Sequence, residues 1–204
     1  SFRISTTCVC IMSPLGAART LITAGGAAAG ALTLIKANTF SGSSSVVVNN
    51  IEEDVYDVHF FTVSLTGSHQ DITIFIDFST DNGSSFLTDD LAFSKSFGQT
   101  DGTFNQATST DLYGINFMQS ADTNFGGGGY GYFYTLGDSG RHSYVNCHAI
   151  YERSGDSDVK RFEHGGGSTT ADQTVDAFRF YPNIASPGIT GRYALYGLEE
   201  SWVV

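Results

Sequence analysis

Apolar and polar residues alternate one by one along much of the chain from Leu32 onward, and this period of two constrains the fold more than any other feature. The segment DITIFIDF is the clearest case, because every second residue from position 72 to 78 is Ile or Phe. SYVNCHAIY alternates in the same way between 143 and 151. Successive side chains of a β-strand point to opposite faces, so the pattern indicates strands that each bury one face.

About ten segments carry strand-like sequence, and turns rich in Gly, Asn, Asp and Ser separate them. DVYDVHFFTVSL shifts its alternation at Phe60–Phe61, which predicts either a β-bulge or a strand that is buried on both faces. The glycine runs at 126–129 and 165–167 are interpreted as loops between strands. We therefore expect an all-β protein of roughly ten strands, arranged as an antiparallel β-sandwich or barrel, with an extended N-terminal arm.

The first 31 residues differ in composition from the rest of the chain, because small residues, chiefly Ala and Gly, are frequent among them. Their most apolar part, LITAGGAAAGALTLI at 21–35, contains three glycines and is shorter than the ~20 residues of a membrane-spanning helix. No insertion into a membrane is therefore expected. We interpret residues 1–31 as a docking arm and residues 32–204 as the β-sandwich domain.

The formal net charge of −11 argues against nucleic-acid binding, because an acidic surface repels phosphate backbones. The three cysteines, Cys8, Cys10 and Cys147, imply no disulfide framework, because their number is odd and Cys8 and Cys10 are too close to each other to pair. Synthesis in a reducing cytoplasm is the simpler interpretation. A bond from Cys147 to one of the other two cysteines stays open.

Sequence motifs for catalysis and for metal binding are weak in this chain. GDSG at 137–140 matches four residues of the trypsin-like serine proteases, but Arg141 stands where that motif continues with Gly, and we predict a turn. The five histidines form no HExxH motif and the cysteines no CxxC motif, so no metal and no cofactor is expected. The 21 acidic residues do not reveal the carboxylate pair of a glycosidase, so a carbohydrate-active enzyme stays an alternative.

STDNGSSF at 79–86 resembles the Asp-box, a structural hairpin loop of sialidase-like propellers and other carbohydrate-associated β proteins. Asp81 is expected to accept backbone N–H groups and Gly83 to adopt a positive φ, while Phe86 packs beneath the turn. Ser79 begins the motif. Since the motif occurs once, it predicts a structural turn and not a propeller. A looser calcium site in the same loop stays open.

The segment GGGGYGYFY contains three tyrosines at alternate positions, Tyr130, Tyr132 and Tyr134. Side chains on one face of such a strand could stack on sugar rings, so these tyrosines are candidate binding residues. The alternative hypothesis places them in the core of the sandwich.

The order of several segments resembles a module of tailed-bacteriophage virion proteins, often described as tail fibre proteins, over most of residues 32–198. The similar segments are LTLIKANTFSGSSSVVV, VYDVHFFTVSLT, IFIDFSTDNGSSF, SYVNCHAIYERSG and VDAFRFYPNIASPGITGRYALYGL. The module typically closes with a strand that ends in Leu-Tyr-Gly. Here that closure consists of Leu195, Tyr196, Gly197 and Leu198.

The resemblance implies a jelly-roll-like domain on the exterior of a virion that assembles in the host cytoplasm. A non-enzymatic fibre, spike or receptor-binding module is the first expectation, with the arm anchoring it to other virion proteins. Such proteins are commonly trimers, and a host-surface glycan is a further candidate partner. A capsid-decorating cement protein is the alternative within the virion. The module brings no catalytic residues.

Overall fold

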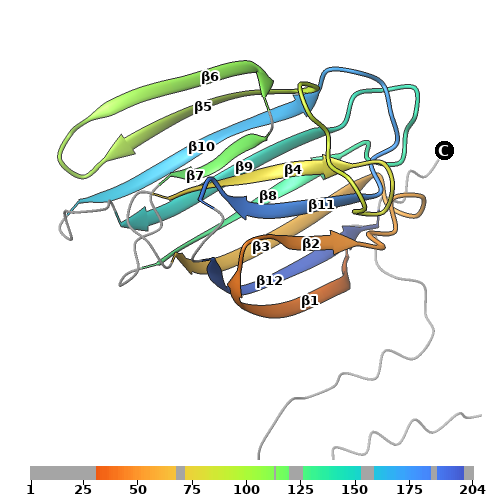
Figure 1. The fold of residues 1–204 in the computed structure, drawn as a ribbon, viewed down its shortest axis with the longest axis horizontal. Helices are drawn as coiled ribbons and strands as arrows, with labels where there is room; N and C mark the ends of the chain where they lie inside the picture. Colours follow the sequence, from red (N-terminus) through yellow and green to blue (C-terminus); the bar gives the residue numbers. More distant parts are fainter. Residues whose placement is uncertain are drawn as a thin grey trace, which may run out of the picture.

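The computed structural model describes residues 31–67, 72–112, 114–119, 126–152, 159–184 and 188–199, and these residues form an all-β fold (Figure 1). The strands are β1 (Leu32–Ser43), β2 (Val46–Asn49), β3 (Val58–Gly67), β4 (Thr73–Ser79), β5 (Leu91–Gln99), β6 (Phe104–Leu112), β7 (Ile115–Gln119), β8 (Gly127–Tyr134), β9 (Tyr144–Glu152), β10 (Lys160–Thr169), β11 (Ala177–Pro182) and β12 (Ile189–Leu198). All their pairings are antiparallel. Most of the expected arm, residues 1–30, lies outside the described part of the chain.

The strand order is that of a jelly roll with two insertions. One sheet has the order β1-β12-β3-β8-β9-β10-β5-β6 and the other β2-β11-β4-β7. Without β5, β6, β9 and β10, the remaining strands, renumbered along the chain, lie in the orders 1-8-3-6 and 2-7-4-5, which is the jelly-roll arrangement. The two inserted strand pairs both extend the larger sheet. The predicted fold class is confirmed.

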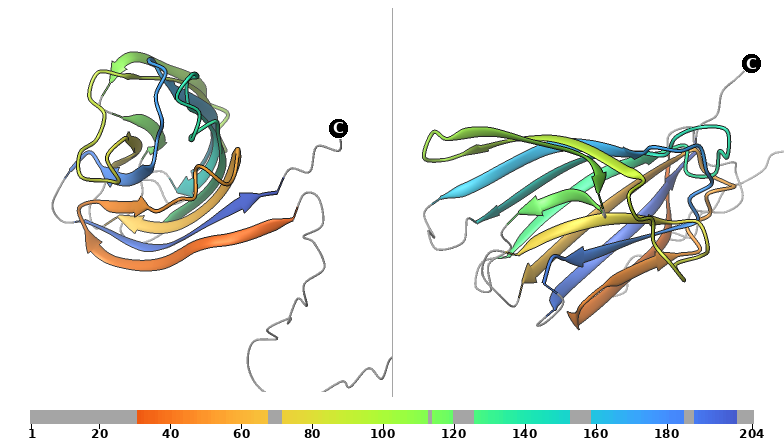
Figure 2. Two further views of the ribbon diagram at one scale, coloured as in Figure 1. Left: turned by 90° about the vertical axis from the view of Figure 1, so that its right-hand side faces the viewer. Right: turned by 45° about the horizontal axis from the view of Figure 1, so that its top comes forward.

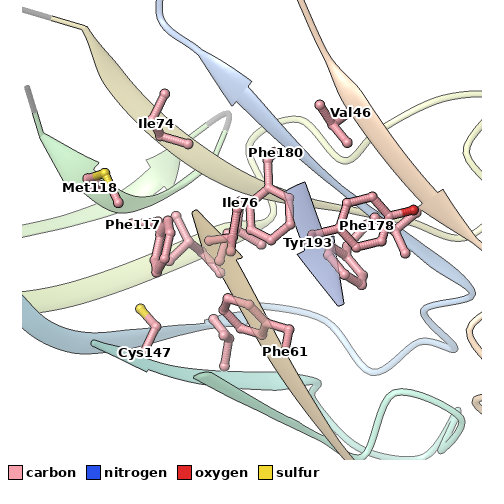
Figure 3. Packing of buried hydrophobic residues seen from close by; sticks show 14 of the residues in the cluster. Val46, Phe61, Ile74, Ile76, Phe117, Met118, Cys147, Phe178, Phe180 and Tyr193 are labelled. Atoms are coloured by element: carbon pink, nitrogen blue, oxygen red, sulfur yellow. The ribbon is translucent and has the colours of Figure 1, made fainter. Parts of the chain in front are cut away.

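The larger sheet curls around the smaller one, and the core lies between them (Figure 2). Phenylalanines from both sheets meet there, among them Phe61 of the larger sheet and Phe178 and Phe180 of the smaller one (Figure 3). Phe133 stacks on Phe61 with ring centroids 4.9 Å apart and lies 4.6 Å from Phe178. The alternating residues of DITIFIDF are fully buried in this layer, as the sequence predicts. Aromatic side chains from both sheets therefore pack against one another within a core that also contains many aliphatic residues.

Two strands, β1 and β6, are additional to the ten that the sequence suggests, and the two glycine runs are not loops. Gly127–Gly129 begin β8, and Gly165–Gly167 lie within β10. A Cβ atom on Gly167 would lie 2.7 Å from Ile115 Cγ1, so a side chain of the smaller sheet occupies that space. The interpretation of these glycines as loop residues was wrong because they allow the two sheets to approach closely.

The closing segment supplies one strand to each sheet. β11 lies in the smaller sheet, whereas β12 lies between β1 and β3 in the larger one. Leu195 is fully buried, Gly197 leaves no room for a side chain beside the Tyr56 ring, and Leu198 pairs with Leu32. The Leu-Tyr-Gly closure is thus part of an interior strand, which has a neighbouring strand on each side.

Strand β3 resolves the shifted alternation at Phe60–Phe61. It pairs with β12 and with β8 without any change of register, so the bulge alternative is wrong. Phe61 points into the core, and Phe60 is half-buried on the opposite face beneath neighbouring tyrosines. Both faces of this strand are therefore largely covered.

Candidate functional site

The larger sheet has eight strands, and we call the face of this sheet that points away from the core the outer face. Directly paired residues of an antiparallel sheet share a face, so the register defines rows of side chains across the strands. Four successive rows run from β1 toward β6. The first row is Leu32, Leu198, Val58, Tyr134, Tyr144, Ser168 and Ala92, and the second is Leu34, Tyr196, Phe60, Tyr132, Asn146, Gly166, Ser94 and Thr108. The third row is Ala37, Ala194, Thr62, Tyr130, His148, His164, Ser96 and Gln106, and the fourth is Thr39, Arg192, Ser64, Gly128, Ile150, Phe162, Gly98 and Phe104.

These four rows are almost free of formal charge. Among their described residues only Arg192 is charged, although the chain contains 21 acidic and 10 basic residues. Many carboxylates lie instead in loops between strands, at 52–54, 89–90 and 172–176. Within these four rows the outer face is thus nearly uncharged, and the Lys160–Glu152 ion pair lies on the same face in the next row.

Aromatic rings gather on the outer face around Phe60. The Phe60 ring lies 6.2 Å from Tyr130, 5.0 Å from Tyr132 and 6.1 Å from Tyr196, measured between centroids. Tyr130 and Tyr134 are exposed and Tyr132 is half-buried. The three candidate tyrosines of β8 thus lie together outside the core, and the hypothesis that placed them in the core was wrong, because Phe133 and glycines occupy the inward positions of that strand.

The rings of one row stack on one another. Tyr130 lies over His148 with centroids 5.1 Å apart and an interplanar angle of 15°, and His148 lies 6.2 Å from His164 at 24°. Both faces of the His148 ring are thus directed toward a neighbouring ring, which favours contact through ring edges. A hollow of 470 Å³ beside this row is lined in part by Thr62, Ile150 and Phe162.

The Asp-box-like loop makes most of the bonds that its sequence predicts. Asp81 Oδ1 accepts hydrogen bonds from Ser79 Oγ at 2.8 Å and from the Ser85 N–H at 2.8 Å, and Asp81 Oδ2 accepts one from Ser85 Oγ at 2.6 Å. The Ser85 and Ser79 donors hold the pKa of Asp81 below its ordinary value. Gly83 has a φ of 83°. Both carboxylate oxygens of Asp81 are engaged within the loop, so its role is structural.

This loop joins β4 to β5, which belong to different sheets, and so it is not the hairpin that the motif implies. Its aromatic residue, Phe86, packs under the Arg179 guanidinium, whose carbon lies 3.9 Å from the ring centroid. Arg179 in turn donates a hydrogen bond of 2.8 Å to Asp77 Oδ2. The motif therefore anchors the connection between the sheets to a buried ion pair.

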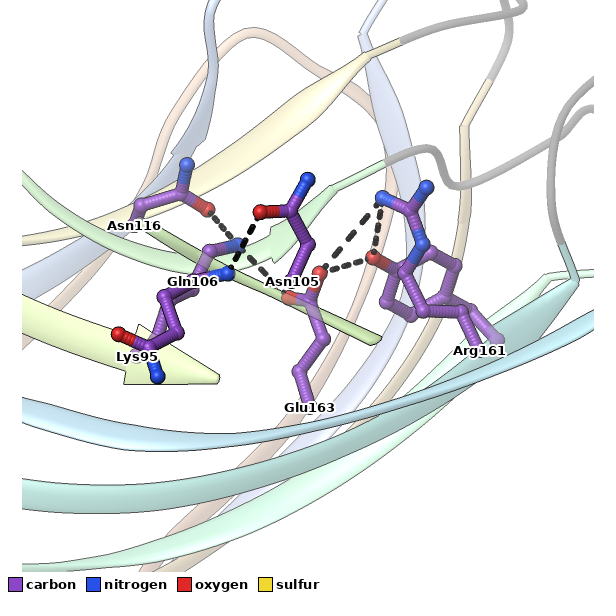
Figure 4. A network of polar contacts seen from close by, with 7 residues as sticks. Lys95, Asn105, Gln106, Asn116, Arg161 and Glu163 are labelled. Carbon is purple, nitrogen blue, oxygen red and sulfur yellow. Dashed lines mark hydrogen bonds and ion pairs between the residues drawn. The ribbon is translucent and has the colours of Figure 1, made fainter. Parts of the chain in front are cut away.

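A second buried polar cluster lies on the side of the larger sheet that faces the core (Figure 4). Lys95 Nζ donates to Glu163 Oε2 at 2.8 Å and to Asn116 Oδ1 at 2.8 Å, and the Tyr151 hydroxyl donates to Glu163 Oε1. Burial lowers the pKa of Lys95, and the Glu163 carboxylate opposes that shift. Arg161 lies 3.8 Å from the same carboxylate. The Lys95–Glu163 pair thus joins four strands, β5, β7, β9 and β10.

The sequence interpretation missed this cluster, and one signal could have found it. In the segment VKRFE, Arg161 and Glu163 occupy alternate positions of a strand, so they share a face. Charged residues on the inward face are buried only when they are paired. The partner Lys95 could not be identified without the strand pairing.

The other candidate residues lie in a turn or in the core. GDSG forms the predicted turn, in which Arg141 N–H donates to Asp138 O at 3.3 Å and Gly140 N–H donates to Asp138 Oδ1 at 2.9 Å. Cys147 is a free, buried thiol, and burial raises its pKa to about 12. In the described part of the chain, no group of three or more His, Cys, Asp or Glu side chains could hold a metal ion. Within the same residues, no helix could span a membrane.

Comparison with known proteins gives no match at a significant level: no protein-family model, no curated protein and no solved structure resembles this chain. The jelly-roll assignment therefore depends on the strand order itself.

Proposed function

We propose that this chain is a non-enzymatic structural protein of a bacteriophage virion, displayed on the particle exterior as part of a fibre or spike. The observation that carries the proposal is the aromatic and nearly uncharged group of side chains on the outer face of the jelly roll. Exposed apolar patches of this extent are typical of surfaces that contact other proteins. The segments that resemble phage virion proteins fall in β1 and β2, β3, β4, β9, β11 and β12, which come from both sheets.

The buried carboxylates favour a structural role over the carbohydrate-active enzyme. A glycosidase needs two carboxyl groups about 5–10 Å apart on either side of the scissile bond. Glu163 is instead enclosed by Lys95, Tyr151 and Arg161, and Asp77 is held by Arg179. Each of these carboxylates is neutralised by a cation that the fold itself supplies.

The proposal is tested by labelling purified particles with an antibody against residues 32–204 and imaging them by electron microscopy. Label on the tail or on projecting fibres supports the fibre or spike assignment, and glycan binding then becomes the next assay. Label spread over the head identifies a capsid-decorating cement protein, whose loss should make capsids less stable. A complete lack of label on particles would contradict the virion assignment and revive the enzyme alternative.

A deletion tests the role of the arm in the same system. The variant that lacks residues 1–31 is expected to give a folded, soluble β domain, because β1 begins at Leu32 and the core lies beyond it. The same variant should fail to enter particles. Failure of the truncated chain to fold would place the first 31 residues in the domain and contradict the boundary.

A further inference from the structure

We propose that His148 of β9 and His164 of β10 form a surface site for a divalent transition-metal ion, with water in the remaining coordination positions. The two histidines are direct partners in the antiparallel register, and both side chains are exposed on the outer face. The expectation of no metal came from motifs that lie within one segment, whereas this pair comes from two strands. The proposal does not depend on the virion assignment, because it uses only the register, the contacts and the charge of these residues.

The strand pairing brings the two histidine side chains close together. A Cβ atom on Gly129 would lie 2.4 Å from the His148 carbonyl oxygen, so this carbonyl points toward β8. Because the N–H and C=O groups of a strand residue point toward the same neighbouring strand, His148 and His164 form a non-hydrogen-bonded pair. The Cα atoms of such a pair are about 4.5 Å apart, and its side chains are closer than those of a hydrogen-bonded pair. Two imidazoles at this spacing can reach one ion.

The ring nitrogens of this pair are available as ligands. His59 and His142 each bond to a backbone carbonyl oxygen through a ring nitrogen. Among the described residues, no hydrogen bond engages the ring nitrogens of His148 or His164. Tyr130 stacks on the His148 ring with centroids 5.1 Å apart, and this contact covers a face of the ring. The edge that carries the nitrogens is therefore the part of the ring that can bind.

A side-chain rotation is enough to bring both rings onto one ion. The ring centroids of His148 and His164 are 6.2 Å apart, with an interplanar angle of 24°. An ion that is bound by two imidazole nitrogens at about 2.0–2.1 Å requires these nitrogens to lie within about 4.2 Å of each other. Rotation of the exposed His164 ring toward His148 shortens this distance. Gly166, the next residue of β10 on the same face, places no side chain in the way.

The charge around the pair selects the class of ion. The described residues of the four rows include no Asp or Glu, so the site lacks the carboxylate oxygens that Ca²⁺ and Mg²⁺ prefer. Glu152 lies two rows away on the same face and is paired with Lys160. Imidazole suits Zn²⁺, Ni²⁺ and Cu²⁺, and Cu²⁺ is bound most tightly of the three. Arg192 is separated from β9 by β3 and β8, and the formal net charge of −11 attracts cations to the protein.

The experiment is isothermal titration calorimetry of the full chain with ZnCl₂ and with CuCl₂, in a buffer that does not bind metal, at about pH 7.5. Every chain carries Cys8→Ser and Cys10→Ser, because thiolates also bind these ions. This parent chain is expected to bind one ion. Electron paramagnetic resonance of its Cu²⁺ form counts the nitrogen ligands, and two are expected.

Substitutions locate the ion on the outer face. His148→Gln and His164→Gln should each weaken binding about 100-fold, because one imidazole alone loses the advantage of two linked ligands. His142→Gln is the matched control and should bind like the parent chain, since a backbone carbonyl already engages that ring. Circular dichroism verifies that each variant folds. If a glutamine variant does not fold, the nitrogen count on the parent chain decides, because it needs no further substitution.

Three results would overturn the proposal. The first is a parent chain that binds Zn²⁺ and Cu²⁺ no more tightly than the folded variants His148→Gln and His164→Gln. The second is an equal loss of binding in His142→Gln, which would place the ion elsewhere. The third is a Cu²⁺ form with fewer than two nitrogen ligands, or binding that excess Mg²⁺ abolishes, since the acidic surface would then hold the ion.

Discussion

Lys95 and Glu163 form an ion pair in which the Nζ–Oε2 distance is 2.8 Å and the side chains are only 3% and 2% exposed. They are not direct partners in the sheet: the residue opposite Lys95 is Gly165, two positions beyond Glu163. A Cβ atom on Gly165 would lie 2.5 Å from Lys95 Cβ, so glycine leaves the space along which the lysine approaches its diagonal partner. The glycine run of β10 therefore provides the space that the ion pair needs.

Removal of either charged side chain of this ion pair should destabilise the fold. Glu163→Gln or Lys95→Met is expected to lower the free energy of unfolding by about 3–5 kcal/mol, because the remaining charge stays buried without its counter-ion. The combined change Lys95→Met/Glu163→Leu should cost less than either single change. Urea unfolding measures these values. Arg141→Ala, which removes an exposed pair with Asp138, is the control and should change stability by about 1 kcal/mol or less. A small effect of Glu163→Gln would show that water reaches the cluster.

Stability should decrease between about pH 4 and pH 7 through Asp77. Burial raises the pKa of Asp77 from 3.8 to about 6, and the Arg179 hydrogen bond offsets part of that rise. Since the folded protein binds this proton more tightly than the unfolded chain, the stabilisation is complete below pH 3.8 and is lost as the pH rises through about 6. The loss is of the order of 3 kcal/mol at about 1.4 kcal/mol per pKa unit.

Comparison with Asp77→Asn isolates this contribution, because all other titrating groups are common to both chains. Unfolding free energies of both proteins, measured at about pH 4 and about pH 7, should differ in their pH dependence by the amount that Asp77 contributes. Parallel curves for the two proteins would mean that Asp77 stays ionised in the folded state across this range.

Gly131→Ala should destabilise the core. An added Cβ would lie 2.6 Å from Phe61 Cε1, and Phe61 is packed against Phe133 and Phe180. Overpacking of this kind costs about 1–3 kcal/mol. Gly140→Ala is the matched control, because its nearest neighbour would be Asp138 Oδ1 at 3.4 Å. Guanidinium unfolding of both variants gives the comparison, and equal stabilities would show that the aromatic layer can shift to accommodate a methyl group.

Cys147 should be unreactive in the native protein. The thiolate is the reactive form, and burial raises the pKa of Cys147 to about 12. Treatment with iodoacetamide at about pH 8, followed by mass spectrometry of the peptide that contains Cys147, should show little modification. The same peptide should be modified fully in guanidinium chloride. Rapid modification of the native protein would indicate that β9 opens readily from the sheet.

The sequence predicted the fold class well because most strands bury one face. Every second residue of β4 and β9 is apolar because it points into the core of the sandwich. β6 was missed for a related reason: it is an edge strand with polar residues such as Gln106 and Thr108 on its exposed side, so it shows no apolar period. The glycine runs were misinterpreted because their role depends on the side chains that lie against them, and those side chains, Phe117 at Gly129 and Ile115 at Gly167, come from another strand.

The candidate site could be predicted only in part. The alternation placed Tyr130, Tyr132 and Tyr134 on one face of a strand, but it could not identify that face as the outer one. Phe133 competes for the core, and glycines at 129 and 131 decide the orientation because they allow Phe117 and Phe61 to pack against the sheet. The scarcity of charge in the four rows is a property of residues from eight strands, so it becomes visible only when the register is known.

The position of β12 affects how the protein is made. β1 is attached to the larger sheet only by β12, which also separates it from β3, and the Thr33–Glu199 hydrogen bond joins residues that are 166 positions apart. Because synthesis proceeds from the N-terminus, β1 waits for its partner until nearly all the other strands have emerged from the ribosome. A chain that terminates early leaves a vacant place between β1 and β3. The last strand of the fold is therefore the one that fixes the first strand in place.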